Sequence, residues 1–191
     1  MLSYTARANA FTAKKYLQLS PQDNHFGELI MDVNIINPVI TSMINILSTM
    51  AHIVPIAGKP ELKSKNNLVQ GKHITGLMNM TGPKARASIA LTFPEAAILH
   101  IANKMLPQDI QRIDGLTIDL AGELANMVLG STKGILEEKG MIFDLSLPTI
   151  IVGSEYLIAH RTDAPVIILP FSIPEGTFFV EASYETIPGT C

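Results

Sequence analysis

The residues of this sequence best suited to chemistry are Glu123 and Asn126, three positions apart in a long helical pattern. Residues at this spacing are neighbours on a helix surface. A carboxylate can pair with a cation, and an amide can both donate to and accept from one water molecule. A glutamate and an asparagine are also typical of an ordinary solvated helix face, so the spacing alone leaves both interpretations open.

A long helix is predicted over residues 117–139, with Gly140 after it as a C-terminal cap. Side chains follow one another at about 100° around a helix axis, so the apolar positions form one arc that faces the core. This arc comprises Ala121, Leu124, Ala125, Val128 and Ile135, with Leu120 and Met127 at its edge. The opposite, exposed arc comprises Asp119, Glu123, Asn126, Gly130, Lys133 and Glu137.

Three glycines, Gly122, Gly130 and Gly134, lie inside this predicted helix, where each costs about 1 kcal/mol relative to alanine. All three project onto the polar arc or beside it. A helix face lined by glycine is flat and lets another backbone come close. That backbone can belong to a partner protein or to the chain itself, and the pattern leaves both interpretations open.

Other kinds of site have weaker support in the sequence. The segment 130–134 has phosphate-loop residues, but it lacks the spacing GxxxxGK[ST] and lies within a helix. The five histidines are scattered without paired ligand spacing, so no metal site is predicted. A Ser/His/Asp triad stays open, although no GxSxG nucleophile elbow occurs.

The composition is that of a compact folded domain. The 191 residues are 47% hydrophobic and 16% charged, which excludes an intrinsically disordered chain. The net charge is −3 without a clustered basic excess, so no nucleic-acid partner is expected. No apolar run approaches the roughly 18 residues of a membrane span. The single cysteine, Cys191, cannot form an internal disulfide, which favours a reducing, cytoplasmic location.

Residues 1–31 are interpreted as an N-terminal extension. The segment lacks the continuous apolar stretch of a secretory signal, while its basic residues and its scarcity of acids are compatible with an organellar presequence. A second interpretation is favoured. The five residues at 27–31 could be translated from a ribosome-binding site followed by a start codon, which makes Met31 the natural first residue.

Residues 32–191 predict an α+β domain with two similar halves, at about 32–107 and 114–187. The first helix is expected to open at Asn37-Pro38, an N-cap and first-turn pair, and to end near residue 52. The second helix is expected at 95–105, and strands at 74–80, 87–93, 143–145, 149–152, 156–160, 166–173 and 177–184. The run 166–169 is apolar on both faces, which predicts a central strand. The repeated order of helix, irregular strands and hairpin indicates a duplicated unit, with long helices packed on a largely antiparallel sheet.

The stretch 119–136, which contains Glu123 and Asn126, is similar to the signature helix of the CheX/CheC/FliY family of chemotaxis phosphatases. Four further segments resemble CheX: 36–50, 88–106, 145–153 and 163–171. The similarity extends over about 32–184 and is therefore more specific than the Glu123–Asn126 spacing. It implies an enzyme, a phosphatase that hydrolyses the aspartyl phosphate of a CheY-type response regulator.

The resemblance also implies roles for single residues. Glu123 would form a salt bridge to the regulator's active-site lysine, and Asn126 would orient the attacking water. We expect Gly122, Gly130 and Lys133 to contact this partner. No cofactor of the chain's own is expected, because the regulator brings its own Mg²⁺.

Members that resemble CheC carry a second motif on the first helix. Here the aligned positions run from Ser42 to Asn45 and lack the glutamate, which resembles the single-site arrangement of CheX. The same resemblance implies a homodimer that shares one β-sheet. Two alternatives stay open: a non-catalytic module that binds a regulator or a flagellar-switch component, and an enzyme that acts on a small acyl phosphate.

Overall fold

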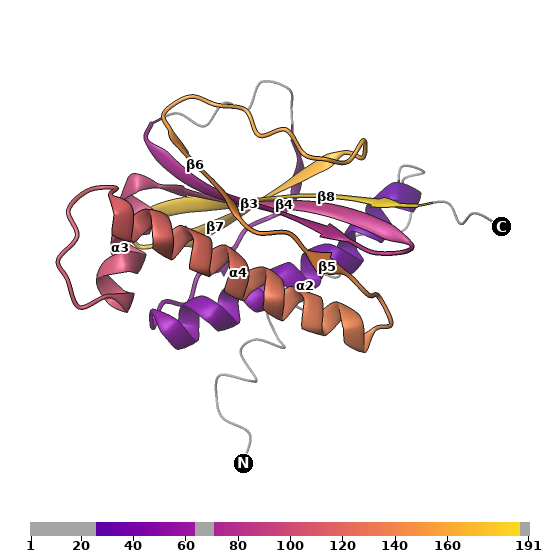
Figure 1. Cartoon of the computed structure of the whole chain (residues 1–191), viewed down its shortest axis with the longest axis horizontal. Helices are drawn as coiled ribbons and strands as arrows, with labels where there is room; N and C mark the ends of the chain where they lie inside the picture. Colours follow the sequence, from indigo (N-terminus) through magenta and orange to yellow (C-terminus); the bar gives the residue numbers. More distant parts are fainter. Residues whose placement is uncertain (1–25, 64–70, 188–191) are drawn as a thin grey trace, which may run out of the picture.

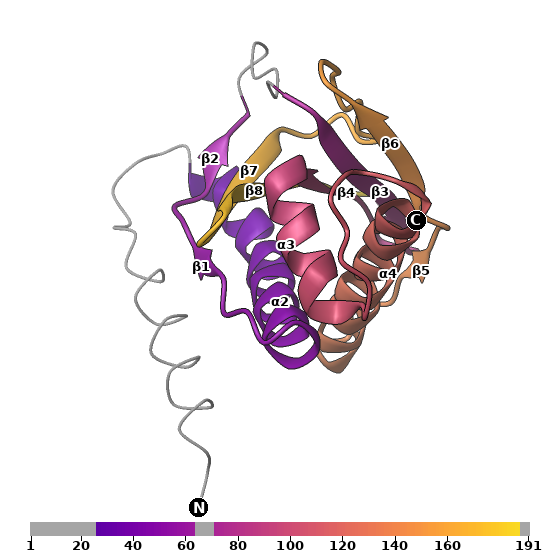
Figure 2. The same cartoon turned by 90° about the vertical axis from the view of Figure 1, so that its left-hand side faces the viewer.

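In the part of the chain that the structure describes, three helices pack on one face of a single β-sheet (Figure 1). The structure, a computed structural model, describes residues 26–63 and 71–187. The helices are α2 (Phe26–Met50), α3 (Glu95–Met105) and α4 (Gly115–Glu138). Figure 2 shows all three below the sheet, with the connection between β6 and β7 on the other side. This arrangement confirms the predicted α+β class.

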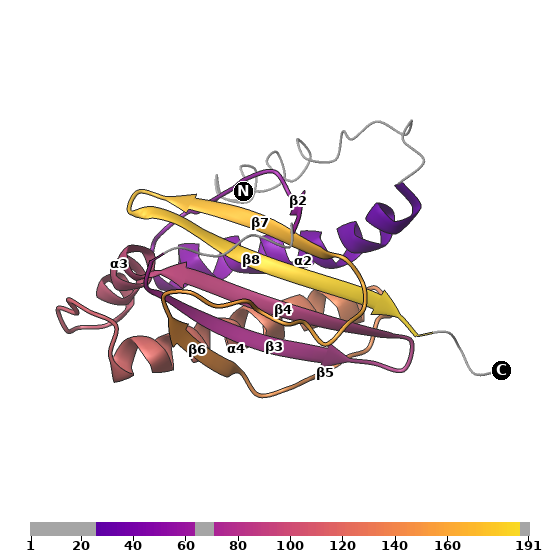
Figure 3. The same ribbon diagram turned by 90° about the horizontal axis from the view of Figure 1, so that it is seen from above.

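The sheet has eight strands, and all of its pairings are antiparallel among the described residues. They are β1 (Ile56–Ala57), β2 (Glu61–Leu62), β3 (His73–Thr81), β4 (Ala85–Pro94), β5 (Asp144–Leu145), β6 (Thr149–Gly153), β7 (Val166–Ile173) and β8 (Gly176–Thr186). The order is β1-β7-β8-β4-β3-β5, with β2 also on β7 and β6 also on β3. The hairpins β3–β4 and β7–β8 therefore meet at the centre of the sheet through β4 and β8 (Figure 3).

The two halves of the chain have the same order of elements and exchange strands. Each half contains one long helix, two short strands and one hairpin, starting with α2 and α4 respectively. The short strands of each half pair with the hairpin of the other half: β1 and β2 with β7, β5 and β6 with β3. The registers also correspond. Leu62 of β2 pairs with Ile167 of β7, and its equivalent in the other half, Ile150 of β6, pairs with Gly76 of β3. The predicted duplication is confirmed, and the halves are related by a pseudo-twofold axis.

A hydrogen bond between the two long helices shows which residues of α2 and α4 are equivalent. The Ser42 hydroxyl of α2 donates to the Ser131 hydroxyl of α4 at 3.0 Å, across 89 positions of the chain. The first residues of the helices, Phe26 and Gly115, are separated by the same 89 positions. Ser42 and Ser131 are thus equivalent residues that meet on the pseudo-twofold axis.

The predicted alignment of Ser42 with Glu123 is therefore wrong. Going back 89 positions from Glu123 and Asn126 leads to Asn34 and Asn37. These two positions, rather than Ser42 and Asn45, are the first-helix counterparts of the candidate pair. The glutamate is absent in this register too.

The error begins with the predicted helix start at Asn37-Pro38. Helix α2 begins at Phe26 and contains Pro38. A proline lacks the N–H that bonds to the carbonyl four residues earlier, so a proline inside a helix resembles a helix start in sequence. Most of the predicted extension, residues 1–25, lies outside the described residues.

Two strand predictions are also wrong. Residues 156–160 form no strand; they cross the outer face of the sheet, where the Tyr156 hydroxyl lies 2.7 Å from that of Thr75. Strand β7 is not central, because only the short β1 and β2 cover its outer edge. Its side chains alternate between buried and more exposed positions, so the apolar run does not mean burial on both faces.

Local signals define both ends of α4. Asp114 accepts hydrogen bonds from the backbone N–H groups of Leu116 and Thr117, at 3.0 and 3.2 Å, and its own N–H donates to the Thr117 hydroxyl. This reciprocal arrangement is a capping box. Gly140 follows the helix at φ +79°, in the left-handed conformation that glycine adopts without strain. The predicted C-terminal glycine cap is confirmed.

Small residues bring the middle of α4 close to the sheet. A Cβ added to Gly76 of β3 would lie 3.0 Å from the Cβ of Ala125 and 3.2 Å from the carbonyl oxygen of Ala121. Both alanines are fully buried. Because this space cannot hold another carbon without movement of the helix, glycine and alanine set the height of α4 above β3.

A buried carboxylate ties the crossing segment to the outer face of the sheet. Glu181 of β8 is 3% exposed, and its Oε2 accepts hydrogen bonds from Lys63 Nζ at 2.6 Å and from His160 Nε2 at 3.0 Å. Ala90, its partner across β4 and β8, is also its counterpart in the other half. Glu181 therefore lies on the pseudo-twofold axis and joins residues from both halves.

We expect Glu181 to make the fold sensitive to acid. Burial raises the pKa of this carboxyl, but hydrogen bonds from His160 and Lys63 outweigh burial and hold the pKa below its ordinary value of 4.5. A carboxyl with a lower pKa in the folded state stabilises the fold above its unfolded pKa, and this stabilisation is lost as the pH falls through the folded pKa.

Urea denaturation at a series of pH values measures this effect. The free energy of unfolding should decrease below about pH 4.5, and the Glu181→Gln variant should lack this part of the decrease. The variant should also lose roughly 3 kcal/mol or more at neutral pH, because Lys63 keeps a charge without its partner. Equal pH dependence of wild type and variant would contradict the assigned role.

Candidate active site

Glu123 and Asn126 lie in the middle of α4, and both side chains are exposed. Leu124, Ala125 and Val128 are fully buried, so the predicted orientation of the helix is confirmed around the pair. Within residues 26–63 and 71–187, neither Glu123 nor Asn126 has a hydrogen-bond or ion-pair partner. Both polar groups are therefore available to a molecule that docks on α4.

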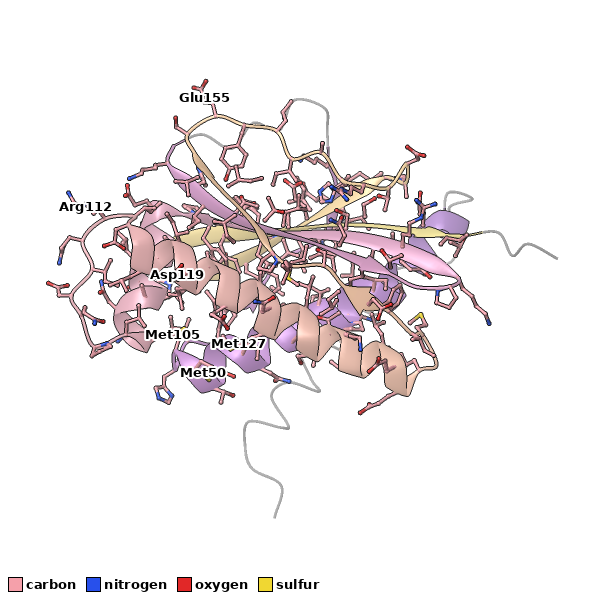
Figure 4. The ribbon with its side chains drawn as sticks, in the orientation of Figure 1. Met50, Met105, Arg112, Asp119, Met127 and Glu155 are labelled. Atoms are coloured by element: carbon pink, nitrogen blue, oxygen red, sulfur yellow. The ribbon has the colours of Figure 1, made fainter. Side chains whose placement is uncertain are left out.

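The exposed stripe continues along the helix in both directions. Asp119 and Gly130 are exposed about one turn before and after the pair. Figure 4 shows Asp119 on α4 near the start of this stripe. Toward the end of the helix the prediction is less accurate, because Leu136 is buried and Ile135 only half-buried.

The three glycines of α4 have different surroundings. Apart from the neighbouring backbone of its own helix, a Cβ added to Gly130 or Gly134 would have no atom within 4 Å. Gly122 is buried, and a Cβ there would lie 3.6 Å from Ile150 Cδ1 and 3.9 Å from Pro148 Cγ. The sequence places Gly122 on the polar arc or beside it and predicts that it contacts a partner, but in the structure it is buried and faces strand β6 of its own chain. Gly130 keeps the space that a partner would need.

An apolar segment borders the stripe on the sheet side. The chain between β5 and β6 runs alongside α4 in Figures 1 and 2, with Pro148 against Gly122. Leu147, just before this proline, is 87% exposed. The segment that packs against α4 just before Glu123 therefore carries an exposed leucine.

Methionines border the stripe on the helix side. Figure 4 shows Met127 of α4 in the same region as Met105 and Met50, the last residues of α3 and α2. Met105 and Met127 are half-buried against the core, and Met50 is 47% exposed. Methionine side chains adapt their shape to a contacting surface.

Lys133, which is predicted to contact a partner, forms an ion pair within α4. Its Nζ lies 2.6 Å from Glu137 Oε1, one turn later, and both side chains are partly exposed. Such surface pairs contribute only about 0.5 kcal/mol. An acidic group on a docking protein can therefore replace Glu137 at little cost.

The structure brings a serine, a histidine and a glutamate together at another place. His160 Nδ1 lies 3.0 Å from Ser88 Oγ, and His160 Nε2 lies 3.0 Å from Glu181 Oε2. The Ser88 residue is fully buried and the His160 side chain is 2% exposed, so no substrate can reach the hydroxyl. This group is part of the buried network, and it does not form a catalytic triad.

The described residues offer neither a metal site nor a membrane-spanning helix. No group of three or more histidine, cysteine, aspartate or glutamate side chains in residues 26–63 and 71–187 is arranged to hold a metal ion. In the same residues, no helix is long and apolar enough to cross a membrane. A small apolar gap between α2 and the sheet is lined by Ile36, Val39, Ile167, Leu169, Val180 and Ala182. Its lining has no charged group, so α4 remains the candidate site.

Residues 74–172 match the family model of the chemotaxis phosphatase CheX. The match covers more than half of the chain and includes α4 with Glu123 and Asn126. The chain belongs to the CheX family. Membership confirms the family indicated by the sequence resemblance and the predicted phosphatase class. CheX membership does not assign a role to either residue of the pair.

Relatives of known structure or activity agree with membership in the CheX family. A CheC-like superfamily protein from Shewanella sp. PV-4 is 42% identical, with a TM-score of 0.74, over 80% of this chain and 98% of that one. The CheY-P phosphatase CheX of Thermotoga maritima is 26% identical over 144 residues, 75% of this chain and 90% of the relative. A structure of a CheX-CheY-BeF3-Mg²⁺ complex from Borrelia burgdorferi shares the fold, at 23% identity and a TM-score of 0.65, over 78% of this chain and 97% of that one.

The different surroundings of the glycines give a prediction for stability. Gly130→Ala should raise the free energy of unfolding by up to about 1 kcal/mol, because alanine favours the helix and its Cβ enters open space. Gly76→Ala is the matched control and should be destabilising, because its Cβ would be forced against Ala125. Urea denaturation of both variants measures the two effects. A destabilised Gly130→Ala variant would show that Gly130 packs against its own chain.

Proposed function

We propose that this chain hydrolyses the aspartyl phosphate of a CheY-type response regulator. The observation that carries the proposal is the exposed pair Glu123 and Asn126 on α4 of a CheX-family chain. Two relatives support it: the T. maritima protein is a CheY-P phosphatase, and the B. burgdorferi protein forms a complex with CheY. In the proposed complex Asn126 orients the attacking water, and Glu123 forms a salt bridge with the active-site lysine of the regulator.

An aspartyl phosphate is an activated acyl phosphate, so its hydrolysis depends on positioning and electrostatics. The water oxygen forms a bond to phosphorus, and the bond between phosphorus and the aspartyl oxygen breaks. The products are the free aspartate and inorganic phosphate, and the water proton passes to a phosphate oxygen or a neighbouring carboxylate. The Asn126 amide can hold the water by donating and accepting hydrogen bonds. A hundredfold acceleration corresponds to about 2.7 kcal/mol, which such positioning can supply.

The metal ion in this proposal belongs to the regulator. The B. burgdorferi complex contains Mg²⁺ together with CheY and BeF3. Here Glu123 pairs with a lysine and needs no metal. Gly130 and Lys133 extend the proposed docking surface, since Gly130 leaves room for another backbone and Lys133 can exchange Glu137 for an acidic group.

We also propose that the protein is cytoplasmic and forms a homodimer in which two sheets join at their edges. Strand β6 pairs with β3 on one side and has no strand on its other side among the described residues. An open edge of this kind favours pairing with a second chain. Light scattering of the purified protein measures the mass in solution.

Removal of the Asn126 amide should abolish the acceleration. We expect Asn126→Ala to leave the melting temperature unchanged or slightly higher, because the side chain is exposed in a helix. The rate of phosphate loss from the regulator should fall to the spontaneous rate, a decrease of about a hundredfold for the acceleration assumed above. Asn45→Ala, at an exposed asparagine of α2, is the matched control and should keep full activity. Normal activity of Asn126→Ala would refute the assigned role.

The Glu123 salt bridge should appear in the salt dependence of the reaction. Glu123→Gln removes the charge that pairs with the regulator's lysine, so kcat/KM should fall and depend less on ionic strength. Glu138→Gln makes the same change in net charge at an exposed position of the same helix and should behave as wild type. The measurement is kcat/KM over a series of salt concentrations. Identical curves for Glu123→Gln and Glu138→Gln would exclude the salt bridge.

A further inference from the structure

We propose that Leu147 is an apolar anchor for the receiver domain of the response regulator. The inference rests on the proposed function, because the partner is the regulator named there. Leu147 is 87% exposed, more than any other large hydrophobic residue that the structure describes. A single exposed leucine is ordinary, but the backbone of this one is held in place next to α4.

The backbone that carries Leu147 is fixed on both sides. Before it, the Ser146 N–H donates to the Asn79 carbonyl at 2.9 Å, and the Asn79 N–H donates to the Ser146 hydroxyl at 3.0 Å. That hydroxyl also lies 3.0 Å from the Leu147 carbonyl and donates to it. After it, Pro148 lies against Gly122 of α4. An apolar side chain on a fixed backbone loses little conformational entropy when a partner covers it.

Leu147 directly precedes Pro148, and Pro148 packs at the start of the turn of α4 that carries Glu123 and Asn126. Pro148 lies against Gly122, the residue before Glu123. From Pro148 back to β5 the chain runs in the same direction as α4 runs from Gly122 to Asn126 (Figures 1 and 3). In the proposed complex, a receiver domain that docks on this turn reaches Leu147 at its border, and an apolar contact there helps to exclude bulk water from the reacting phosphate.

The other half of the chain provides an internal comparison. The Gly58 N–H donates to the Pro170 carbonyl at 2.7 Å, which is the counterpart of the bond between Ser146 and Asn79. The next residue, Lys59, is thus the counterpart of Leu147, and it is exposed. The fold accepts a lysine at this corner, so it does not require a leucine.

The comparison also links the leucine to the candidate pair. Lys59 lies at the corner beside α2. The residue of α2 that is equivalent to Glu123 is Asn34. The leucine and the glutamate therefore occur together in one half of the chain and are both absent from the other. The dimer proposed above, paired along the open edge of β6, would bring a second copy within two residues of Leu147, and the oligomeric state measured below distinguishes that occupant. The regulator is the occupant that uses both the leucine and the glutamate.

The test measures binding separately from hydrolysis. The probe is the beryllofluoride-activated receiver domain of each CheY-type regulator of the source genome, titrated against the chain in the Asn126→Ala background. Leu147→Ser should weaken the affinity by about tenfold or more, the effect expected from leaving one leucine side chain unburied. Leu62→Ser removes a 60% exposed leucine from the opposite side of the sheet and should leave the affinity unchanged.

The outcomes separate the two proposals. Unchanged affinity of Leu147→Ser for a receiver that binds wild type overturns the anchor, while phosphate release by wild type still supports the proposed function. Binding that depends on Leu147 without any phosphate release supports the anchor and overturns the hydrolytic function. A change of Leu147→Ser from dimer to monomer at constant receiver affinity assigns the leucine to a contact between copies and overturns the anchor. Absence of binding to every receiver overturns both proposals.

Discussion

Helix α4 packs on β3 where Gly76 contacts Ala121 and Ala125. This contact sets the height of the helix above the sheet, and with it the position of the exposed Glu123 and Asn126. A larger side chain at any of the three positions would lift the helix or tilt it. On the neighbouring face of α4, Gly122 faces Ile150 and Pro148 of the edge segment, which would lie 3.6 and 3.9 Å from a Cβ at this position. The small residues of α4 therefore have two sets of tasks. Those facing inward position the helix, and Gly130 keeps its outer surface open.

The duplicated halves have diverged around this contact. The counterparts of Gly76 and Ala125 are Ile167 and Ile36, and both line the small apolar gap under α2. Where the second half brings a helix close with glycine and alanine, the first half fills the interface with branched side chains. The counterpart of Gly130 is Thr41, which has a side chain on the exposed surface. One helix of the pair has thus become a support, while the other presents the candidate site.

Local patterns in the sequence predicted much of this arrangement. The hairpins, the helix Glu95–Met105, the glycine cap of α4 and the exposure of Glu123 and Asn126 depend on short-range periodicity and turn chemistry, which a sequence displays directly. The errors arose where distant contacts decide. Pro38 lies inside a helix, and Gly122 looked exposed because its covering strand lies about 30 residues away in sequence. The buried network around Glu181 joins Lys63 and His160 from opposite halves, so no local spacing could reveal it.

The exchange of short strands between the halves has a consequence for folding. Neither half can complete its own sheet, because β1 and β2 require β7, and β5 and β6 require β3. The central pairing of β4 with β8 also joins segments that are distant in the chain. A fold dominated by such non-local pairings has a high contact order and is expected to fold slowly. During synthesis the first half emerges with the edge of β4 unpaired, so it depends on the arrival of β8 to cover an edge that otherwise invites aggregation.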